Sequence, residues 1–213
     1  MTLGGLFYFL KLVYFDSTIV SFIFALCLTL GVSAYNGLFL QPDDDFPPRL
    51  VWLLGPSILL LITGLINKRT RGLMLAVEDK NWILIHLIRI PVELFIYWWF
   101  LKDLVPEIMT FTGRNFDILI GISAVLIYYF GFVKEVLNPW IIIGWNLIGL
   151  AFLINIVVIA IFSAPTAIQV YGFDQPNNAV LVFPYIYLPV IIVPLVFLAH
   201  VLSIIKNIVA LKH

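Results

Sequence analysis

The sequence predicts an all-α fold, namely a polytopic membrane helical bundle of six transmembrane helices preceded by a short N-terminal interfacial helix. Of its 213 residues, 62% are hydrophobic and only 11% are charged, whereas globular proteins average about 45–50% apolar and 25% charged residues. The apolar residues also gather in six runs that can cross a hydrocarbon layer roughly 30 Å thick, which takes about 17–25 helical residues. This composition excludes a secreted or cytosolic enzyme.

The six runs form a single transmembrane domain over residues 1–213, with no soluble domain or linker between them. The predicted spans are residues 17–40, 50–66, 82–101, 116–132, 139–162 and 179–205. Ahead of the first span, residues 3–15 are rich in aromatic side chains and contain one lysine. This run is too short to cross, so we expect it to lie in the membrane interface.

The distribution of Lys and Arg predicts the orientation, because cytoplasmic segments carry the excess of these residues. With the N-terminus inside, three basic residues fall in the outer loops: Arg49, Lys102 and Arg114. Eight fall on the inner side: Lys11, Lys68, Arg69, Arg71, Lys80, Lys134, Lys206 and Lys212. Both termini are therefore predicted to be cytoplasmic.

The third span contains His86, Arg89, Pro91 and Glu93. At about 100° per residue, His86, Arg89 and Glu93 fall within an arc of roughly 60° on one helix face. A charge at the bilayer centre costs about 2.5–3.5 kcal/mol, so this face is predicted to contact protein or water and not lipid. Pro91 removes a backbone donor and predicts a bend beside the charges.

Two readings of this face stay open. Arg89, Glu93 and His86 could form an intramembrane site on the pathway of an ion, proton or small solute, with Asn146 and His200 of later spans as further members. Alternatively, Arg89 and Glu93 could pair within the helix and only stabilise packing, although Glu after Arg is the less favourable order at this spacing.

The two inner histidines raise the question of a cofactor. His86 and His200 both lie about 6–7 Å from the inner ends of their predicted spans, at about 1.5 Å per residue. Two imidazoles at one depth can ligate a b-type haem in a helical bundle, and we keep this as an alternative to the favoured prediction of no cofactor. Cys27 is the only cysteine, which excludes a disulfide framework and a cysteine metal site.

The sixth span and the outer loops hold the remaining candidates. Pro184, Pro189 and Pro194 predict that the sixth span is either bent or shorter, with a helix that begins near Pro189. In the outer loops, turns at Gly113 and Pro176 hold Arg114, Asp117 and Asp174 near the membrane surface. These three charged residues are predicted to form an ion-paired outer lid.

The loop strings GRNFD at residues 113–117 and FDQPN at residues 173–177 resemble those of uncharacterised bacterial multi-pass integral membrane proteins. The resemblance covers roughly the second half of the chain and implies a setting in the bacterial inner membrane. It implies no activity, so no functional residue is carried over.

The leading hypothesis is a carrier or channel-like protein in the lipid bilayer. A non-catalytic scaffold or accessory subunit of a larger membrane complex, and a b-haem redox protein, are the alternatives. Hydrolytic motifs such as H-E-x-x-H and G-x-S-x-G do not occur in the sequence, which disfavours an enzyme. A net charge of zero disfavours nucleic acid as a partner, whereas a second copy of the chain is compatible with the sequence.

Overall fold

The computed structural model describes residues 17–40 and 49–212, and this part of the chain is helical and contains no strand. Its α-helices are α2 (Ser17–Tyr35), α3 (Arg49–Ile66), α4 (Lys68–Ala76), α5 (Asp79–Ile85), α6 (Arg89–Phe100), α7 (Asp117–Tyr128), α8 (Pro139–Ser163) and α9 (Val193–Ala210). Short 3-10 turns are η1 (Leu38–Leu40), η2 (His86–Ile88), η3 (Glu107–Met109) and η5 (Ala179–Leu181). Two π-helical turns, η4 (Tyr129–Val133) and η6 (Leu188–Ile192), extend α7 and precede α9. The predicted interfacial helix at residues 3–15 lies outside the described residues.

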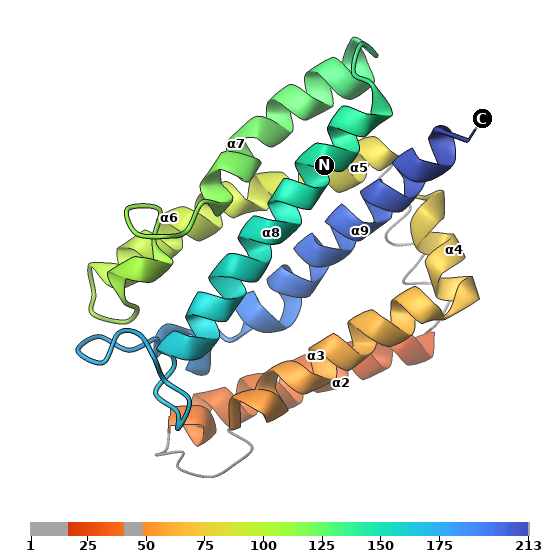
Figure 1. Cartoon of the computed structure of the whole chain (residues 1–213). Coiled ribbons are helices and arrows are strands. Elements are labelled where there is room, and N and C mark those ends of the chain that lie inside the picture. The colour runs from red at the N-terminus through yellow and green to blue at the C-terminus, as the bar shows by residue number, and fades with distance from the viewer. Residues whose placement is uncertain (1–16, 41–48, 213) are drawn as a thin grey trace.

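The helices form two layers around buried apolar side chains (Figure 1). In the larger layer, α8 packs along α9, α5 and η2 continue into α6, and α7 lies against α5 and α6. The smaller layer contains α2 and α3. Leu30 of α2 and Leu53 of α3 share a core with Val180, Ile186 and Val190, which links this layer to the segment before α9.

Capping residues set two of the helix starts. The Oδ1 atom of Asn138 accepts a hydrogen bond from the backbone N–H of Trp140 at 2.9 Å, and Pro139 occupies the first helical turn of α8. Asn67 accepts from the N–H groups of Arg69 and Thr70 at 3.0 and 3.1 Å. Such caps satisfy donors that have no partner within the helix, so α8 and α4 begin where the sequence provides them.

In the described part of the chain, fewer helices than the predicted six are long and apolar enough to cross a membrane. Three qualify, over Asp79–Phe100, Pro139–Ser163 and Leu188–Ala210, and a fourth is counted if α3 and α4, which meet at 84°, make one span. The apolar helices over Ile23–Tyr35 and Asp117–Val133 are shorter. The difference arises because Asn67 starts a new helix after α3 and because the apolar helices over Ile23–Tyr35 and Asp117–Val133 are too short to qualify.

The sixth predicted span begins later than residue 179. After the short 3-10 turn η5, the continuous helix starts at Leu188. Pro189 lies in the π-helical turn η6, and Pro194 occupies the first turn of α9. Proline lacks an N–H donor and is best tolerated where a helix begins. The shorter of the two predicted alternatives, with a helix from near Pro189, is therefore confirmed.

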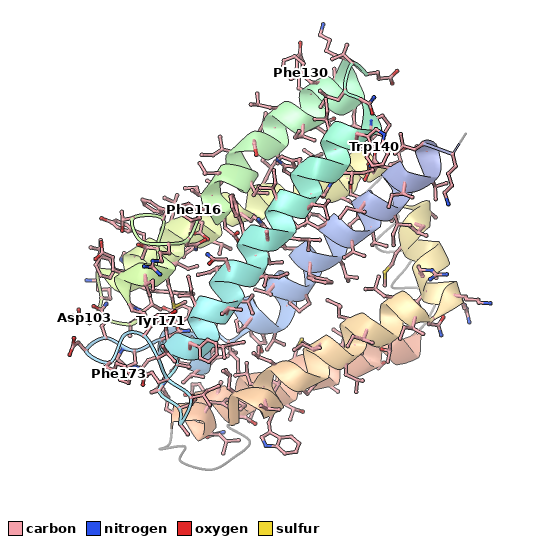
Figure 2. All side chains as sticks on the ribbon, viewed as in Figure 1. Asp103, Phe116, Phe130, Trp140, Tyr171 and Phe173 are labelled. Atoms are coloured by element: carbon pink, nitrogen blue, oxygen red, sulfur yellow. The ribbon has the colours of Figure 1, made fainter. Side chains whose placement is uncertain are left out.

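The outer surface of the larger layer is apolar. Exposed aliphatic side chains on α7 and α8 are Leu119, Ile122, Val125, Leu126, Ile141, Leu147, Ile148, Ile154 and Val158. Figure 2 shows Tyr171 and Phe173 at one end of these helices, beside Asp103, and Phe130 and Trp140 at the other end. An apolar band with aromatic residues at both ends is typical of proteins in a bilayer, and the helices are apolar enough for a membrane location.

Candidate functional site

Three charged side chains are buried together where α6 meets α7. Arg89 and Glu93 come from α6 and Asp117 from the first turn of α7, and their exposed fractions are only 3%, 1% and 4%. The prediction that the His86, Arg89 and Glu93 face avoids the exterior is confirmed, since His86 is also fully buried. A charge removed from water is costly unless it is paired and hydrogen-bonded, so the partners of these groups define the site.

Arg89 pairs with Asp117 and not with Glu93. Its Nη1 atom lies 3.3 Å from Oδ1 of Asp117, and its Nη2 atom donates to the carbonyl of Gly149 at 3.3 Å. The same Nη2 atom lies 3.1 Å from Nε2 of His200. The predicted alternative of an Arg89–Glu93 ion pair is thus wrong in the described structure, because the guanidinium extends to α7, α8 and α9 instead.

Asn115 holds both acidic residues in place. Its Nδ2 atom donates to Oε2 of Glu93 at 2.6 Å and to the carbonyl of Met109 at 3.0 Å. Its Oδ1 atom accepts from the backbone N–H of Asp117 at 3.1 Å. Asn115 thereby fixes the loop before α7 on α6. Sequence reasoning missed this role, although Asn115 lies inside the GRNFD string.

His200 joins Arg89 to a further set of hydrogen-bonded side chains on α8 and α9. Because the guanidinium can only donate, Nε2 of His200 accepts, and the ring is the neutral form that carries its proton on Nδ1. This Nδ1 atom lies 2.8 Å from Oδ1 of Asn146, whose Nδ2 atom donates to Ser203 Oγ at 3.0 Å. The sequence-predicted residues Asn146 and His200 therefore do meet Arg89, and Ser203 is an addition.

His86 contacts this group through its ring and makes no hydrogen bond. Its imidazole stacks on that of His200 with centroids 3.9 Å apart and planes at 25°, and it lies edge-on to Trp145 at 5.2 Å. Both ring nitrogens of His86 are buried without a partner in the described structure. The Nε1 atom of Trp145 in turn donates to Ser123 Oγ at 2.9 Å.

This stacking does not fit the predicted alternative of a haem held by His86 and His200. Axial imidazoles approach the iron from opposite faces of the porphyrin, which lies between them. Here the two rings face each other directly, and both nitrogens of His200 are already hydrogen-bonded to Arg89 and Asn146. Within the described residues, no group of three or more His, Cys, Asp or Glu side chains is arranged to hold a metal ion.

A second set of hydrogen bonds lies near the C-terminal end of α9, beyond His200. Asn207 donates to Oδ2 of Asp79 at 2.5 Å and to the carbonyl of Ser203 at 2.9 Å. Together with the contacts above, it completes a chain of polar side chains, here called the polar column: Glu93, Asn115, Asp117, Arg89, His200, Asn146, Ser203, Asn207 and Asp79. Asp79 and Glu93 are 14 positions apart on one continuous helical run, about 21 Å at about 1.5 Å per residue.

Arg89, Glu93 and Asp117 line one pocket of about 100 Å³ between α3, α6, α8 and α9. Its other lining residues are apolar: Leu50, Leu54, Val92, Ile96, Met109, Leu153, Ile156, Val157, Ala160, Ile161, Val180, Leu188, Pro189, Ile192, Val193 and Val196. The pocket is therefore almost entirely apolar, with only a small polar part to its lining. The other predicted site residues, His86, Asn146 and His200, lie beside the charged residues and do not line the pocket.

The predicted outer lid is not formed. Asp117 is buried and paired with Arg89, whereas Arg114 and Asp174 are exposed, and no ion pair joins these two residues in the part of the chain that is described. The carbonyl of Arg114 instead accepts a hydrogen bond from Asn155 of α8 at 2.8 Å. The carboxylate of Asp117 points inward because the buried guanidinium of Arg89 attracts it more strongly than a solvated partner can.

Two glycines allow the helices of the site to approach closely. A Cβ atom on Gly149 of α8 would overlap the imidazole of His200, and one on Gly121 of α7 would lie 2.9 Å from Cγ1 of Ile90 and 3.3 Å from Cβ of Arg89. Gly149 also offers its carbonyl to Arg89. No sequence signal identified either position, because the need for a small residue depends on which helix lies opposite.

Comparison with known proteins gives a family for the chain. No curated protein and no solved structure matches it. Residues 47–206, which include every charged residue of the pocket, match the model of a family described as a domain of unknown function (DUF8737). Because this match covers well over half of the sequence, the chain belongs to the DUF8737 family.

Proposed function

We propose that this chain is a multi-pass inner-membrane protein that moves a small solute or a proton through an intramembrane polar site. The site consists of Arg89, Glu93 and Asp117, supported by Asn146 and His200. The single observation that carries the proposal is that three buried charged side chains line one pocket. A site built only for packing needs no pocket beside its charges.

The proposed topology has six membrane crossings with both termini in the cytoplasm. Six apolar helical segments support it: three long helices, the bent α3 and α4 pair, and the shorter helices over Ile23–Tyr35 and Asp117–Val133. The excess of Lys and Arg on the inner side supports the orientation. The likeness of the GRNFD and FDQPN loops to bacterial membrane proteins supports the inner membrane as the location.

The pocket favours transport over the accessory-subunit alternative. A subunit that only binds partners needs an apolar exterior such as that of α7 and α8, but lipid covers this surface equally well. The pocket and the polar column lie inside the helical layers, where a partner protein on the exterior cannot contact them. We therefore propose permeation first and keep a second copy of the chain or a membrane partner as a separate question.

Reconstitution into liposomes tests the proposal. The vesicles enclose a pH-sensitive dye, and proton flux is measured after an imposed membrane potential and after addition of ammonium salts. Wild type should exceed protein-free vesicles, and Glu93→Gln, which retains an oxygen acceptor for Asn115, should abolish the excess. Glu107→Gln, the same change at an exposed carboxylate, should behave as wild type. Equal flux in Glu93→Gln and wild type contradicts the proposal.

A further inference from the structure

We infer that the pocket binds an organic cation with a short apolar tail, such as an alkylammonium ion. This inference rests on the proposed function and names the class of solute that the same site takes. Three features of the pocket carry it: its apolar walls, the balance of its charges, and the free oxygens of its two acidic residues.

The apolar residues that line the pocket indicate that its ligand has an apolar part. Every residue that lines the pocket apart from Arg89, Glu93 and Asp117 is apolar. A small hydrated ion would gain no hydrogen bonds from these walls and would lose its water. An apolar tail gains about 0.8 kcal/mol for each CH₂ group removed from water, so the walls favour an amphiphile over a bare inorganic ion.

The charges determine the sign of the head group. The pocket is lined by one guanidinium and two carboxyl groups, so its side chains sum to one negative charge when both carboxyl groups are ionised. A monovalent cation brings this sum to zero. Among the neighbouring groups, His200 is held in its neutral form because its Nε2 atom accepts from Arg89 while its Nδ1 atom donates to Asn146, and His86 stacks on it without lining the pocket.

The hydrogen bonds show that the acidic residues retain free acceptors. Asn115 donates to Oε2 of Glu93, and Arg89 donates to Oδ1 of Asp117. The other oxygen of each carboxyl group, Oε1 of Glu93 and Oδ2 of Asp117, has no hydrogen bond to any described residue. An ammonium group has three donors and no acceptor, which matches these two free oxygens.

An anionic head group fits less well. Both terminal nitrogens of Arg89 already donate, to Asp117, Gly149 and His200. Only its Nε atom is buried without a partner in the described structure, and one N–H cannot replace the bidentate contact that a carboxylate usually makes with arginine. Two nearby carboxylates would also repel the ligand.

Binding of three matched probes tests the inference. Hexylammonium, hexanoate and hexanol share one tail and differ in charge, and isothermal titration compares protein in lipid nanodiscs with empty nanodiscs. Hexylammonium should bind saturably and most tightly. Glu93→Gln should weaken this binding about tenfold, which corresponds to about 1.4 kcal/mol, while Glu107→Gln leaves it unchanged. Ala160→Phe, which fills the pocket, should remove it.

Each other outcome has a defined meaning. Tighter binding of hexanoate or hexanol that Ala160→Phe removes overturns the cation assignment but leaves a solute site in place. Saturable hexylammonium binding that both Glu93→Gln and Ala160→Phe leave intact overturns the assignment of the pocket. Absence of binding by all three probes also overturns the inference, whereas the proposed function fails only if the proteoliposomes show no flux that depends on Glu93. Size-exclusion chromatography of each variant establishes that it is folded.

Discussion

The guanidinium of Arg89 lies 3.3 Å from the carboxylate of Asp117, and the two residues are 28 positions apart on α6 and α7. Both side chains are almost fully buried. The pair therefore joins α6 and α7 inside the apolar layer and fixes the position of two charged residues that line the pocket. Because Asn115 also binds Glu93 and the backbone of Asp117, the positions of the three charged residues depend on one another.

The first prediction concerns this ion pair. Arg89→Met should lower the free energy of unfolding by about 3–5 kcal/mol, because it leaves the carboxylate of Asp117 buried without its cation. The double variant Arg89→Met with Asp117→Leu should recover part of this loss, since no lone charge remains. Thermal unfolding in detergent measures both changes.

Lys102→Met serves as the control for Arg89→Met, because Lys102 is basic but exposed. It should change the unfolding temperature little, as expected for a surface charge. If Arg89→Met is as stable as Lys102→Met, the pair does not hold the helices together.

The second prediction uses two glycines of the same helix. Gly149→Ala should destabilise the protein by about 1–3 kcal/mol, the usual cost of overpacking, because its methyl group would overlap the imidazole of His200. At Gly144 of α8, a methyl group would meet no neighbouring atom within 4 Å. Gly144→Ala should therefore be neutral or slightly stabilising, since alanine favours helix over glycine by about 1 kcal/mol.

Thermal unfolding of the two alanine variants provides the measurement, and the order of their unfolding temperatures is the decisive result. A Gly149→Ala protein at least as stable as Gly144→Ala would show that α8 and α9 are not in close contact at Gly149.

The sequence predicted the helices well where local signals mark their ends. The span predicted at 139–162 is observed over Pro139–Ser163, because Asn138 and Pro139 form a recognisable start. The span predicted at 179–205 was wrong at its start, since the run is apolar from residue 179 but the continuous helix begins only at Leu188. Hydropathy identifies apolar segments and does not by itself show where helical structure begins.

The sequence predicted that the residues of the candidate site are buried, but not which residues they contact. Helical periodicity placed His86, Arg89 and Glu93 on one buried face. The partners of Arg89 could not be predicted, because Asp117 and His200 are 28 and 111 positions away and their direction around each helix depends on packing. For the same reason, the equal depth of His86 and His200 suggested shared ligation, whereas the two rings stack.

The third prediction concerns Asn115. Asn115→Ala removes the donor to Oε2 of Glu93, so we expect a loss of about 1–3 kcal/mol, the cost of a buried acceptor without a partner. The loop around η3 should also exchange its amide hydrogens faster, since Asn115 binds the carbonyl of Met109. Hydrogen exchange followed by mass spectrometry measures both effects.

Asn178→Ala is the matched control for Asn115→Ala. Asn178 precedes η5, and its side chain makes no capping hydrogen bond. Its replacement should leave the exchange of residues 107–116 unchanged. Equal exchange in the two variants would mean that Asn115 does not anchor the loop.

The fourth prediction concerns the C-terminal end of α9. The ammonium group of Lys206 donates to the carbonyls of Leu75 at 2.8 Å and Val77 at 2.7 Å, so it holds the connection between α4 and α5 on α9. Hydrogen bonds from a charged donor contribute about 1.5–3 kcal/mol. Lys206→Met should therefore accelerate hydrogen exchange over residues 68–78 by one to two orders of magnitude, about tenfold for each 1.4 kcal/mol.

Lys212→Met separates this contact from a general effect of charge, because Lys212 carries the same charge near the same end of α9 and is exposed. Both variants remove one cation from the C-terminal end of α9, so a purely electrostatic role predicts the same exchange rates in each. A role in holding α4 predicts faster exchange in Lys206→Met alone, with the exchange of α8 unchanged. Equal protection of residues 68–78 in both variants would rule out Lys206 as their anchor.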